Sequence, residues 1–213
     1  SQELEVTYKT AFVWTHKLRE AITANQHAGT LRGKVEIDGA YFGGHIRPRN
    51  NRPLRQDRRR ISHRASKRQC VTIFRERNGR SRAFAMDEHE AARIVEQIVD
   101  PGSEVFTDQA THFGRIAARY ALKMVNHSER YAEGDTSTNW AESYFSRLRR
   151  AELGTHHHIA GPYLMGYANE CSWREDRRRY SNEENYGELL HMMTHHPVAR
   201  QWKGYWQRRK EAA

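Results

Sequence analysis

Apolar residues near the start of the chain recur with the spacing of an α-helix. Within residues 4–24 they are Val6, Ala11, Trp14, Leu18 and Ile22. Side chains three, four or seven positions apart lie on one face of a helix, so the pattern predicts a helix with an apolar stripe. Thr7 precedes most of this stripe and has a side chain suited to capping a helix start.

A two-residue period replaces the helical one at residues 34–44. Val35 and Ile37 alternate there with Glu36 and Asp38, and this alternation is typical of a strand. The period predicts that both carboxylates lie on the same face of the strand. A Gly-Gly pair then ends the pattern.

The later elements follow from the same two periods and from turn residues. Strands are predicted at residues 69–76 and 81–86, joined by the hairpin dipeptide Asn78-Gly79. The remaining predicted elements are a helix at 87–99 capped near Asp87, a strand ending at Asp108, a helix at 111–120, a strand at 121–127, a long helix at about 137–150 and mostly helical sequence beyond Gly154. The order predicts an α/β fold with a mixed sheet.

Charge narrows the class of partner. The chain has 213 residues, with 36 Lys and Arg against 26 Asp and Glu, and its net charge of +10 suits a polyanion such as nucleic acid. The charge is clustered, because residues 45–68 hold ten Lys or Arg and lack apolar periodicity. We interpret this segment as a basic loop that contacts DNA phosphates.

Other classes of protein fit the sequence poorly. The two cysteines, Cys70 and Cys171, are isolated, so buried reduced thiols in a reducing, cytoplasmic compartment are expected. There is no apolar run of the length that spans a membrane and no secretory leader pattern. The motifs of a serine hydrolase elbow and of an ATP phosphate loop are also missing, so we expect neither chemistry.

Three acidic residues occur where a two-metal site for phosphoryl transfer needs them. Asp38 is on the first strand, Asp108 is at the end of a later strand, and Glu142 is on the long helix that follows. Hard divalent cations prefer oxygen ligands, and two such ions can stabilise the attacking and leaving oxygens of a phosphodiester. A ribonuclease H-like fold brings these acids together by placing its first strand beside its fourth.

Several ordered motifs carry a resemblance to a known family. VEIDGAYFGG, VFTDQATHF, NHSERY, TSTNWAESYFSRLRRAELGTHHHI and WREDRRRYSN together resemble the ISXO-like insertion-sequence transposases, bacterial relatives of the Merlin elements within the DDE superfamily. The resemblance runs from about residue 31 to the C-terminal end. It implies a ribonuclease H-like fold, dependence on Mg²⁺ or Mn²⁺ with two ions per active site, and binding of terminal inverted repeats by a dimer or larger synaptic complex.

The resemblance assigns Asp38 and Asp108 as metal-binding aspartates and leaves the third ligand open. Glu142 follows Asp108 by 34 residues, a separation typical of such sites, and Arg149 stands where DDE transposases often carry a basic residue. Asn139 is the second choice, because some members of the family use Asn there. A capping box formed by Asn139 and Glu142 would explain the same spacing without metal binding.

The long helix divides into two faces. Its polar stripe holds Asn139, Glu142, Ser146 and Arg149, and its apolar side holds Trp140, Ala141, Tyr144, Phe145 and Leu148. We expect the polar stripe to contact metal and DNA and the apolar side to pack on the core.

Other residues near the motifs have two interpretations each. Glu36 is either a nearby active-site carboxylate or an ion-pair partner on the sheet, since Gly39 stands where relatives carry an acid. His127 is either an active-site residue that orients the phosphate or water, or a structural histidine at a strand end. One of His156, His157 and His158 can reach the site or DNA, whereas a zinc site there is not expected.

The candidate DNA-binding residues form three basic clusters, and their binding should weaken steeply with salt. They are Arg47, Arg49, Arg52, Arg55, Arg58, Arg59, Arg60, Arg64, Lys67, Arg68, Arg147, Arg150, Arg177 and Arg178. Aromatic residues near the last cluster and the C-terminal end either stack on bases or pack into the core. They are Trp173, Tyr180, Trp202, Tyr205 and Trp206.

These observations predict three segments and one leading function. Residues 1–30 form a helical segment, either a helix-turn-helix remnant or a plain packing helix; residues 31–180 form the catalytic domain, and residues 181–213 a helical extension. The expected activity is that of a DDE-type DNA transposase, a metal-dependent enzyme of phosphodiester hydrolysis and transesterification. The alternatives are a ribonuclease H-like nuclease without strand transfer and a domesticated DNA-binding protein.

Overall fold

The computed structural model describes residues 5–43, 68–86, 90–108, 111–125, 138–156, 158–159, 161–197 and 199–206, apart from a few side chains within them. Its strands are β1 (Lys34–Phe42), β2 (Gln69–Glu76), β3 (Ser81–Ala85), β4 (Glu104–Asp108) and β5 (Ala121–Val125). Its helices are α1 (Tyr8–Gln26), α2 (Ala91–Ile98), α3 (Asn139–Arg150), α4 (Gly161–Asp176) and α5 (Asn182–His195), with the short helical turns η4 (Thr111–Ile116), η5 (Ala151–Thr155) and η6 (Arg200–Trp202).

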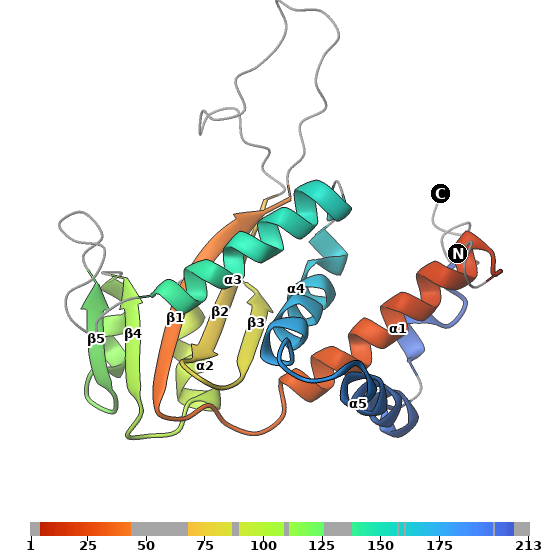
Figure 1. Cartoon of the computed structure of the whole chain (residues 1–213). Helices are drawn as coiled ribbons and strands as arrows, with labels where there is room; N and C mark the ends of the chain where they lie inside the picture. Colours follow the sequence, from red (N-terminus) through yellow and green to blue (C-terminus); the bar gives the residue numbers. More distant parts are fainter. Residues whose placement is uncertain are drawn as a thin grey trace, which may run out of the picture.

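The strands form one mixed sheet in the order β3-β2-β1-β4-β5 (Figure 1). β1 pairs antiparallel with β2 and parallel with β4, and β5 continues the parallel half. The predicted mixed α/β sheet flanked by helices is therefore confirmed, and it is compatible with a ribonuclease H-like fold.

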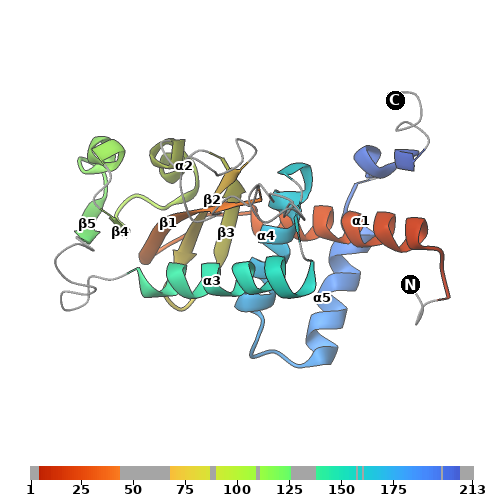
Figure 2. The ribbon, with the colours of Figure 1, turned by 90° about the horizontal axis from the view of Figure 1, so that it is seen from above.

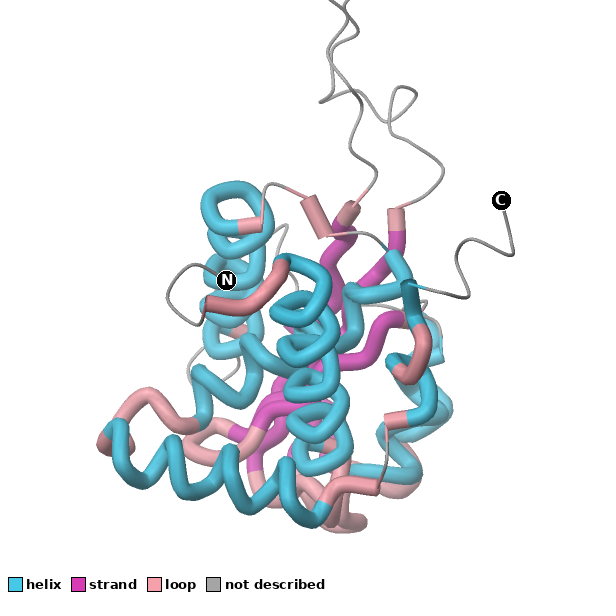
Figure 3. The backbone as a smooth tube through the Cα atoms, turned by 90° about the vertical axis from the view of Figure 1, so that its right-hand side faces the viewer, coloured by secondary structure: helices cyan, strands magenta, loops and turns pink. Residues whose placement is uncertain are grey.

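Helices cover the sheet on both faces. Seen from above, α2 and α3 lie on opposite sides of the strands (Figure 2), and from the side the strands run between the layers of helices (Figure 3). The alternation along β1 explains this arrangement, because Val35 and Ile37 belong to the core beneath α2, whereas Ala40 and Phe42 belong to the core beneath α3 and α4.

The β2–β3 hairpin forms as the Asn78-Gly79 dipeptide predicts. Arg75 pairs with Ser81 at its base, and the carboxylate of Glu76 accepts the backbone N–H of Arg80 at 2.8 Å. A Cβ atom on Gly79 would lie 2.0 Å from that carboxylate. Only glycine therefore fits this turn without a shift of Glu76.

Helix α1 is capped as predicted, but its buried face coincides with the predicted stripe only in part, since Ile22 is buried and Trp14 is not. The hydroxyl of Thr7 accepts the backbone N–H of Thr10 at 3.3 Å. Trp14, expected on the apolar stripe, is 51% exposed, whereas His16 and Arg19 are buried. The reason is tertiary: α1 packs on α4 through these polar residues, and Arg19 forms an ion pair with Glu170 of α4 at 2.7 Å.

The C-terminal end of α1 is fastened to β3. The buried guanidinium of Arg82 donates to the carbonyls of Ala28 and Gly29 at 2.6 and 2.7 Å. Gln26 donates to the carbonyl of Ser81 and to the carboxylate of Asp176, each at 3.0 Å. The end of α1 and the residues after it are thus joined to β3 and α4 by side-chain hydrogen bonds.

Two further predictions differ in extent. The helix predicted at 111–120 is the shorter η4, which bridges the parallel strands β4 and β5. The cap predicted near Asp87 lies outside the described residues.

The cysteines form no disulfide, and burial raises the pKa of Cys171 to about 11. None of the described helices combines the length and the apolar character needed to cross a membrane.

Candidate active site

The first and fourth strands lie side by side, as the sequence predicts. Their parallel register pairs Lys34 with Glu104 and Glu36 with Phe106. Asp38 and Asp108 each follow the last of these pairs by two residues. The same register, continued by two residues, would make the two aspartates neighbours near the C-terminal ends of these parallel strands.

Asp38 lies on the face of β1 that α3 covers, between Glu36 and Ala40. Its side chain is half-buried, and one carboxylate oxygen accepts the backbone N–H of Gly39 at 2.8 Å. Asp108 is described by its backbone alone, as the last residue of β4, where it pairs with Val125 of β5.

Glu36 fixes the start of α3. Its carboxylate is fully buried and accepts the backbone N–H groups of Trp140 and Ala141 at 2.8 and 3.1 Å. It also forms an ion pair with Arg77 at 2.7 Å. Burial, the largest influence, raises the pKa of Glu36 despite these donors. The carboxylate of Glu36 therefore binds the start of α3 and Arg77. These contacts support the interpretation of Glu36 as an ion-pair partner over its interpretation as a fourth active-site acid.

Arg75 holds the same turn of α3 from the neighbouring strand. It lies opposite Glu36 in the β1–β2 register and donates to the carbonyl of Trp140 at 3.0 Å. Its guanidinium also lies 5.1 Å from the centre of the Trp140 ring and donates to Glu175 at 2.9 Å. The first turn of α3 is thus held by hydrogen bonds to both backbone N–H and backbone C=O groups.

The far end of α3 is joined to the far end of β1. The backbone N–H of Gly43 donates to Glu152 in η5 at 3.1 Å, and the rings of Phe42 and Phe145 lie 6.0 Å apart. Because Glu36 meets the start of α3 and Gly43 meets its end, the helix runs along β1 in the same direction. Asp38 therefore lies beneath the N-terminal half of α3.

The two predicted faces of α3 are present. Ala141, Tyr144, Phe145 and Leu148 are buried, and Asn139, Glu142, Ser146 and Arg149 are exposed. One flank, marked by Trp140 and Arg147, meets Arg75 and Glu175 beside α4. At about 100° per residue, Glu142 and Arg149 fall on the opposite flank. Since α4 lies over β3, that flank is on the side of β4 and β5.

The capping box considered for Asn139 and Glu142 is wrong. α3 begins at Asn139, so the cap position belongs to Thr138, whose side chain makes no capping hydrogen bond. The cap comes instead from Glu36 on β1. Its carboxylate accepts two backbone N–H groups in the first turn of α3. Neither Asn139 nor Glu142 is needed as a cap, and both remain exposed.

A comparison with models of protein families shows to which family the chain belongs. The model described as the ISXO2-like transposase domain matches residues 30–176. The chain belongs to this transposase family. Searches of curated proteins and of solved structures gave no match. The match confirms the ISXO-like resemblance and runs from just before β1 to the end of α4, so it includes Asp38, Asp108 and Glu142. The relationship to Merlin elements stays a prediction.

The donor set of this transposase site suits a hard cation. Asp38, Asp108 and Glu142 offer only carboxylate oxygens, which are the ligands that Mg²⁺ and Mn²⁺ favour. Within the described side chains, which do not include that of Asp108, no three His, Cys, Asp or Glu residues gather closely enough to hold a metal. Of the expected ligands, the description covers the side chains of Asp38 and Glu142.

A buried ionic network lies behind α3, and the sequence analysis did not predict it. Glu175 of α4 contacts Arg75 at 2.9 Å, Arg178 at 3.5 Å and also Arg147. Burial raises the pKa of this carboxyl, but the hydrogen bond from Arg75 and the three arginine charges outweigh it and hold the pKa below its usual value. The available signal was Arg75, a charged residue that directly follows the apolar residues Ile73 and Phe74 of β2, because such a residue needs a partner.

The described candidates for DNA binding differ in how strongly the protein engages them. Arg150 is exposed, whereas Arg147 and Arg178 share Glu175. Arg177 donates to Asn185 and lies 4.3 Å from the centre of the Tyr180 ring. Arg68 donates to the carbonyl of Tyr41 at 2.9 Å. The solvent-accessible guanidinium groups thus lie mainly at the end of α3 and after α4.

The remaining candidates have varied outcomes. Trp173 and Trp202 are buried, so packing rather than base stacking describes them. His156 makes an edge-to-face contact with Tyr167, with ring centres 4.5 Å apart, and burial lowers its pKa. The candidates outside the described residues are His127, His157, Arg47, Arg49, Arg52, Arg55, Arg58, Arg59, Arg60, Arg64 and Lys67.

Proposed function

We propose that this transposase-family protein is an active DDE-type enzyme that cleaves DNA at insertion-sequence ends and joins those ends to target DNA. The observation that carries the proposal is the parallel pairing of β1 with β4 up to Glu36 and Phe106, because Asp38 and Asp108 each lie two residues further along these adjacent strands. The exposed flank of α3 that bears Glu142 supplies the third acid on the same side of the sheet. A binding module has no need of three such acids.

In this proposal Asp38, Asp108 and Glu142 hold two Mg²⁺ or Mn²⁺ ions. Bound there, the cations would act as Lewis acids on the scissile phosphate. Glu142 is preferred over Asn139 because a carboxylate binds a hard cation better than an amide does. Both side chains are exposed on the same stripe of α3, so their substitution should not disturb its buried face.

The chain's own residues orient the DNA for an in-line displacement. A water molecule attacks the phosphorus in the cleavage step, and the released 3'-hydroxyl attacks target DNA in the joining step. Arg149, two turns of α3 after Glu142, would neutralise phosphate charge beside the acids, and His127 would orient the phosphate or water. The basic segment 45–68 and Arg147, Arg150, Arg177 and Arg178 would hold the duplex on either side.

A dimer or larger synaptic complex is part of the proposal, because two insertion-sequence ends would be processed together.

The segment boundaries at residues 30 and 180 are proposed as well. α1 is held on β3 and α4 by Arg82, Gln26 and Arg19, so a packing role for this helix has direct support.

The deciding experiment incubates the purified protein with labelled terminal-repeat DNA, a plasmid target and Mg²⁺. Joined products that Asp38→Asn and Asp108→Asn abolish would support the proposal. Glu183→Gln, an exposed acid on α5, is the matched control and should retain activity. Cleavage without joining would favour a nuclease, and DNA binding without either product would favour a domesticated binding protein.

Parallel variants identify the third ligand. Glu142→Gln should reduce joining at least a hundredfold, and Asn139→Ala should reduce it far less. A larger loss of joining in Asn139→Ala than in Glu142→Gln would assign the third metal ligand to Asn139. Full activity of the Asp108→Asn variant would overturn the assigned site.

A further inference from the structure

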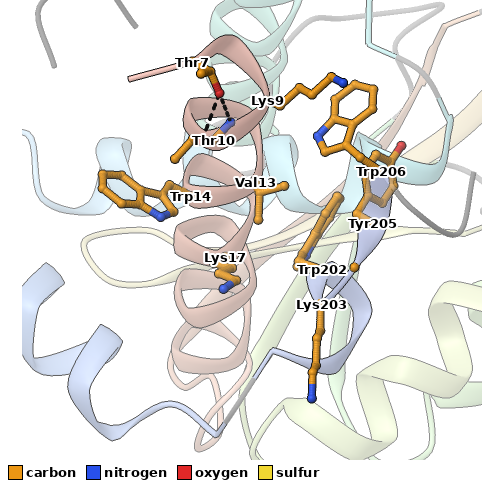
Figure 4. A pocket seen from close by; sticks show the side chains of 11 residues that line it. Thr7, Lys9, Thr10, Val13, Trp14, Lys17, Trp202, Lys203, Tyr205 and Trp206 are labelled. Atoms are coloured by element: carbon orange, nitrogen blue, oxygen red, sulfur yellow. Dashed lines mark hydrogen bonds between the residues drawn. The ribbon is translucent and has the colours of Figure 1, made fainter. Parts of the chain in front are cut away.

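A groove lies between α1 and residues 202–206, far from the proposed active site. Its cavity has a volume of about 640 Å³ and is lined by one face of α1 and by the turn after η6 (Figure 4). In two perpendicular views α1 lies at the opposite end of the molecule from β4 and β5 (Figures 1 and 2). Cavities of this size accommodate ligands as large as a nucleotide.

The charged side chains of the groove have one sign. Lys9 and Lys17 come from α1 and Lys203 from the turn after η6, and the described lining residues include neither Asp nor Glu. Three cations without a lining counter-charge raise the local concentration of an anionic ligand. The groove is therefore complementary to a chain of phosphates.

Three tryptophans, Trp14, Trp202 and Trp206, line the groove together with these lysines. Trp14 projects from α1 and is 51% exposed, although its position in the apolar pattern predicted burial. Across the groove, the ammonium of Lys9 lies 5.5 Å from the centre of the Trp206 ring. The indole N–H of Trp206 is buried and, within the described part of the chain, meets no acceptor. The exposed face of Trp14 is suited to stacking on a base, whereas the buried indole N–H of Trp206 is not accessible to one.

The start of α1 adds a further site for anions. Thr7 and Thr10 line the groove, and the first turn of the helix carries no acidic residue. The free backbone N–H groups and the dipole of a helix N-terminus favour negative charge. This effect supports the three lysines, which carry the main argument.

We propose that this groove binds a single-stranded segment of DNA, with its phosphates on Lys9, Lys17 and Lys203 and one base stacked on Trp14. A basic groove with interleaved aromatic rings is the chemistry that recognises an unpaired strand, because each base presents a face for stacking. The choice of DNA over another polyanion rests on the proposed function. The groove is separate from the acids, so its binding is independent of catalysis.

The test measures binding of a fluorescein-labelled, single-stranded oligothymidylate of 12 nucleotides by anisotropy, in EDTA and across a range of salt concentrations. The protein carries Asp108→Asn throughout, so that cleavage plays no part. The variants are Lys9→Gln/Lys17→Gln/Lys203→Gln, Trp14→Ala and Trp14→Phe. Arg93→Gln, an exposed cation on α2, is the control for loss of charge at an unrelated surface.

The triple lysine variant should lower the salt dependence, the slope of log K against log salt, by about 2, because each phosphate contact on a single strand contributes about 0.7. Trp14→Ala should weaken binding about tenfold, within the range for loss of one stacked base, and Trp14→Phe should restore most of it. Arg93→Gln should leave the slope within about 0.7 of the parent. Circular dichroism should show equal helix content in all variants.

Several results would overturn the proposal. One is failure of the parent protein to bind the oligonucleotide, and another is a triple lysine variant that keeps the parent's slope. Equal binding by Trp14→Ala and the parent would exclude base stacking. A groove that serves as a contact between copies of the chain would show a change of oligomeric state in the lysine variant, with unaltered DNA binding. Terminal-repeat cleavage by the enzyme with intact Asp108 tests the proposed function separately.

Discussion

Glu36 and Arg75, opposite each other on β1 and β2, hold the same turn of α3 from its two kinds of backbone group. Glu36 accepts the N–H of Trp140 at 2.8 Å, and Arg75 donates to the carbonyl of that same residue at 3.0 Å. The helix that carries Glu142 is thereby fixed to the strand that carries Asp38. A rigid frame of this kind keeps catalytic groups in register.

Replacement of Glu36 by Gln should destabilise the protein by about 3 kcal/mol, because Arg77 would lose its buried counter-charge and the helix would lose a charged cap. The measurement is urea unfolding at pH 7, with Glu183→Gln as the control that keeps parental stability. A loss below about 1 kcal/mol would contradict the role assigned to Glu36.

Replacement of Glu175 by Gln should have an effect that depends on pH. The pKa of Glu175 is held below its usual value of 4.5, so its stabilising contribution is present above that pH and is lost as the pH falls through the lowered pKa. The variant should be less stable than the parent by about 3 kcal/mol at pH 7, because Arg75 and its neighbours would lack a buried partner.

Unfolding curves for the parent and Glu175→Gln should converge below pH 4.5. A constant difference between pH 7 and pH 3 would show that the carboxylate charge contributes nothing, and that the variant acts through packing alone.

His16 should destabilise the protein in mild acid. Burial, and then the charge of Arg19, lower its pKa from 6.5 to about 4. A depressed pKa of this kind contributes stability that is complete above pH 6.5 and is lost as the pH falls toward 4, by about 3 kcal/mol over that window. His16→Phe removes the titration and keeps a ring beside Trp202, whose ring centre lies 4.4 Å away.

The free energy of unfolding of the parent should therefore fall more steeply than that of His16→Phe between pH 6.5 and pH 4. Parallel profiles for the two proteins, measured by thermal or urea unfolding at intervals of half a pH unit, would be inconsistent with a neutral buried His16.

Two tryptophans around α1 should differ sharply in their contribution to stability. Trp202 is 6% exposed and stacks on His16, so Trp202→Ala should cost about 3 kcal/mol or more. Trp14 is 51% exposed, so Trp14→Ala should change the free energy of unfolding by no more than about 0.5 kcal/mol. Similar losses in the two variants would mean that α1 packs through its predicted apolar stripe.

The strands and the acids they carry were predictable because their signals are local. Alternation identified β1, the Asn78-Gly79 turn identified the hairpin, and the order of elements predicted that β1 lies beside β4. The two faces of α3 followed from its 3.6-residue period in the same way. In each case the residues that decide the element are its own neighbours in sequence.

The sequence by itself determined where Asp38, Asp108 and Glu142 stand on their elements, since period and spacing are properties of short segments. Only the tertiary structure decided that Glu36 caps α3 from 104 residues away, and that α1 buries Arg19 against Glu170 while Trp14 is exposed. The physical reason is the same for both. A buried polar group must find its partner wherever the fold supplies one, and that partner can be distant in sequence.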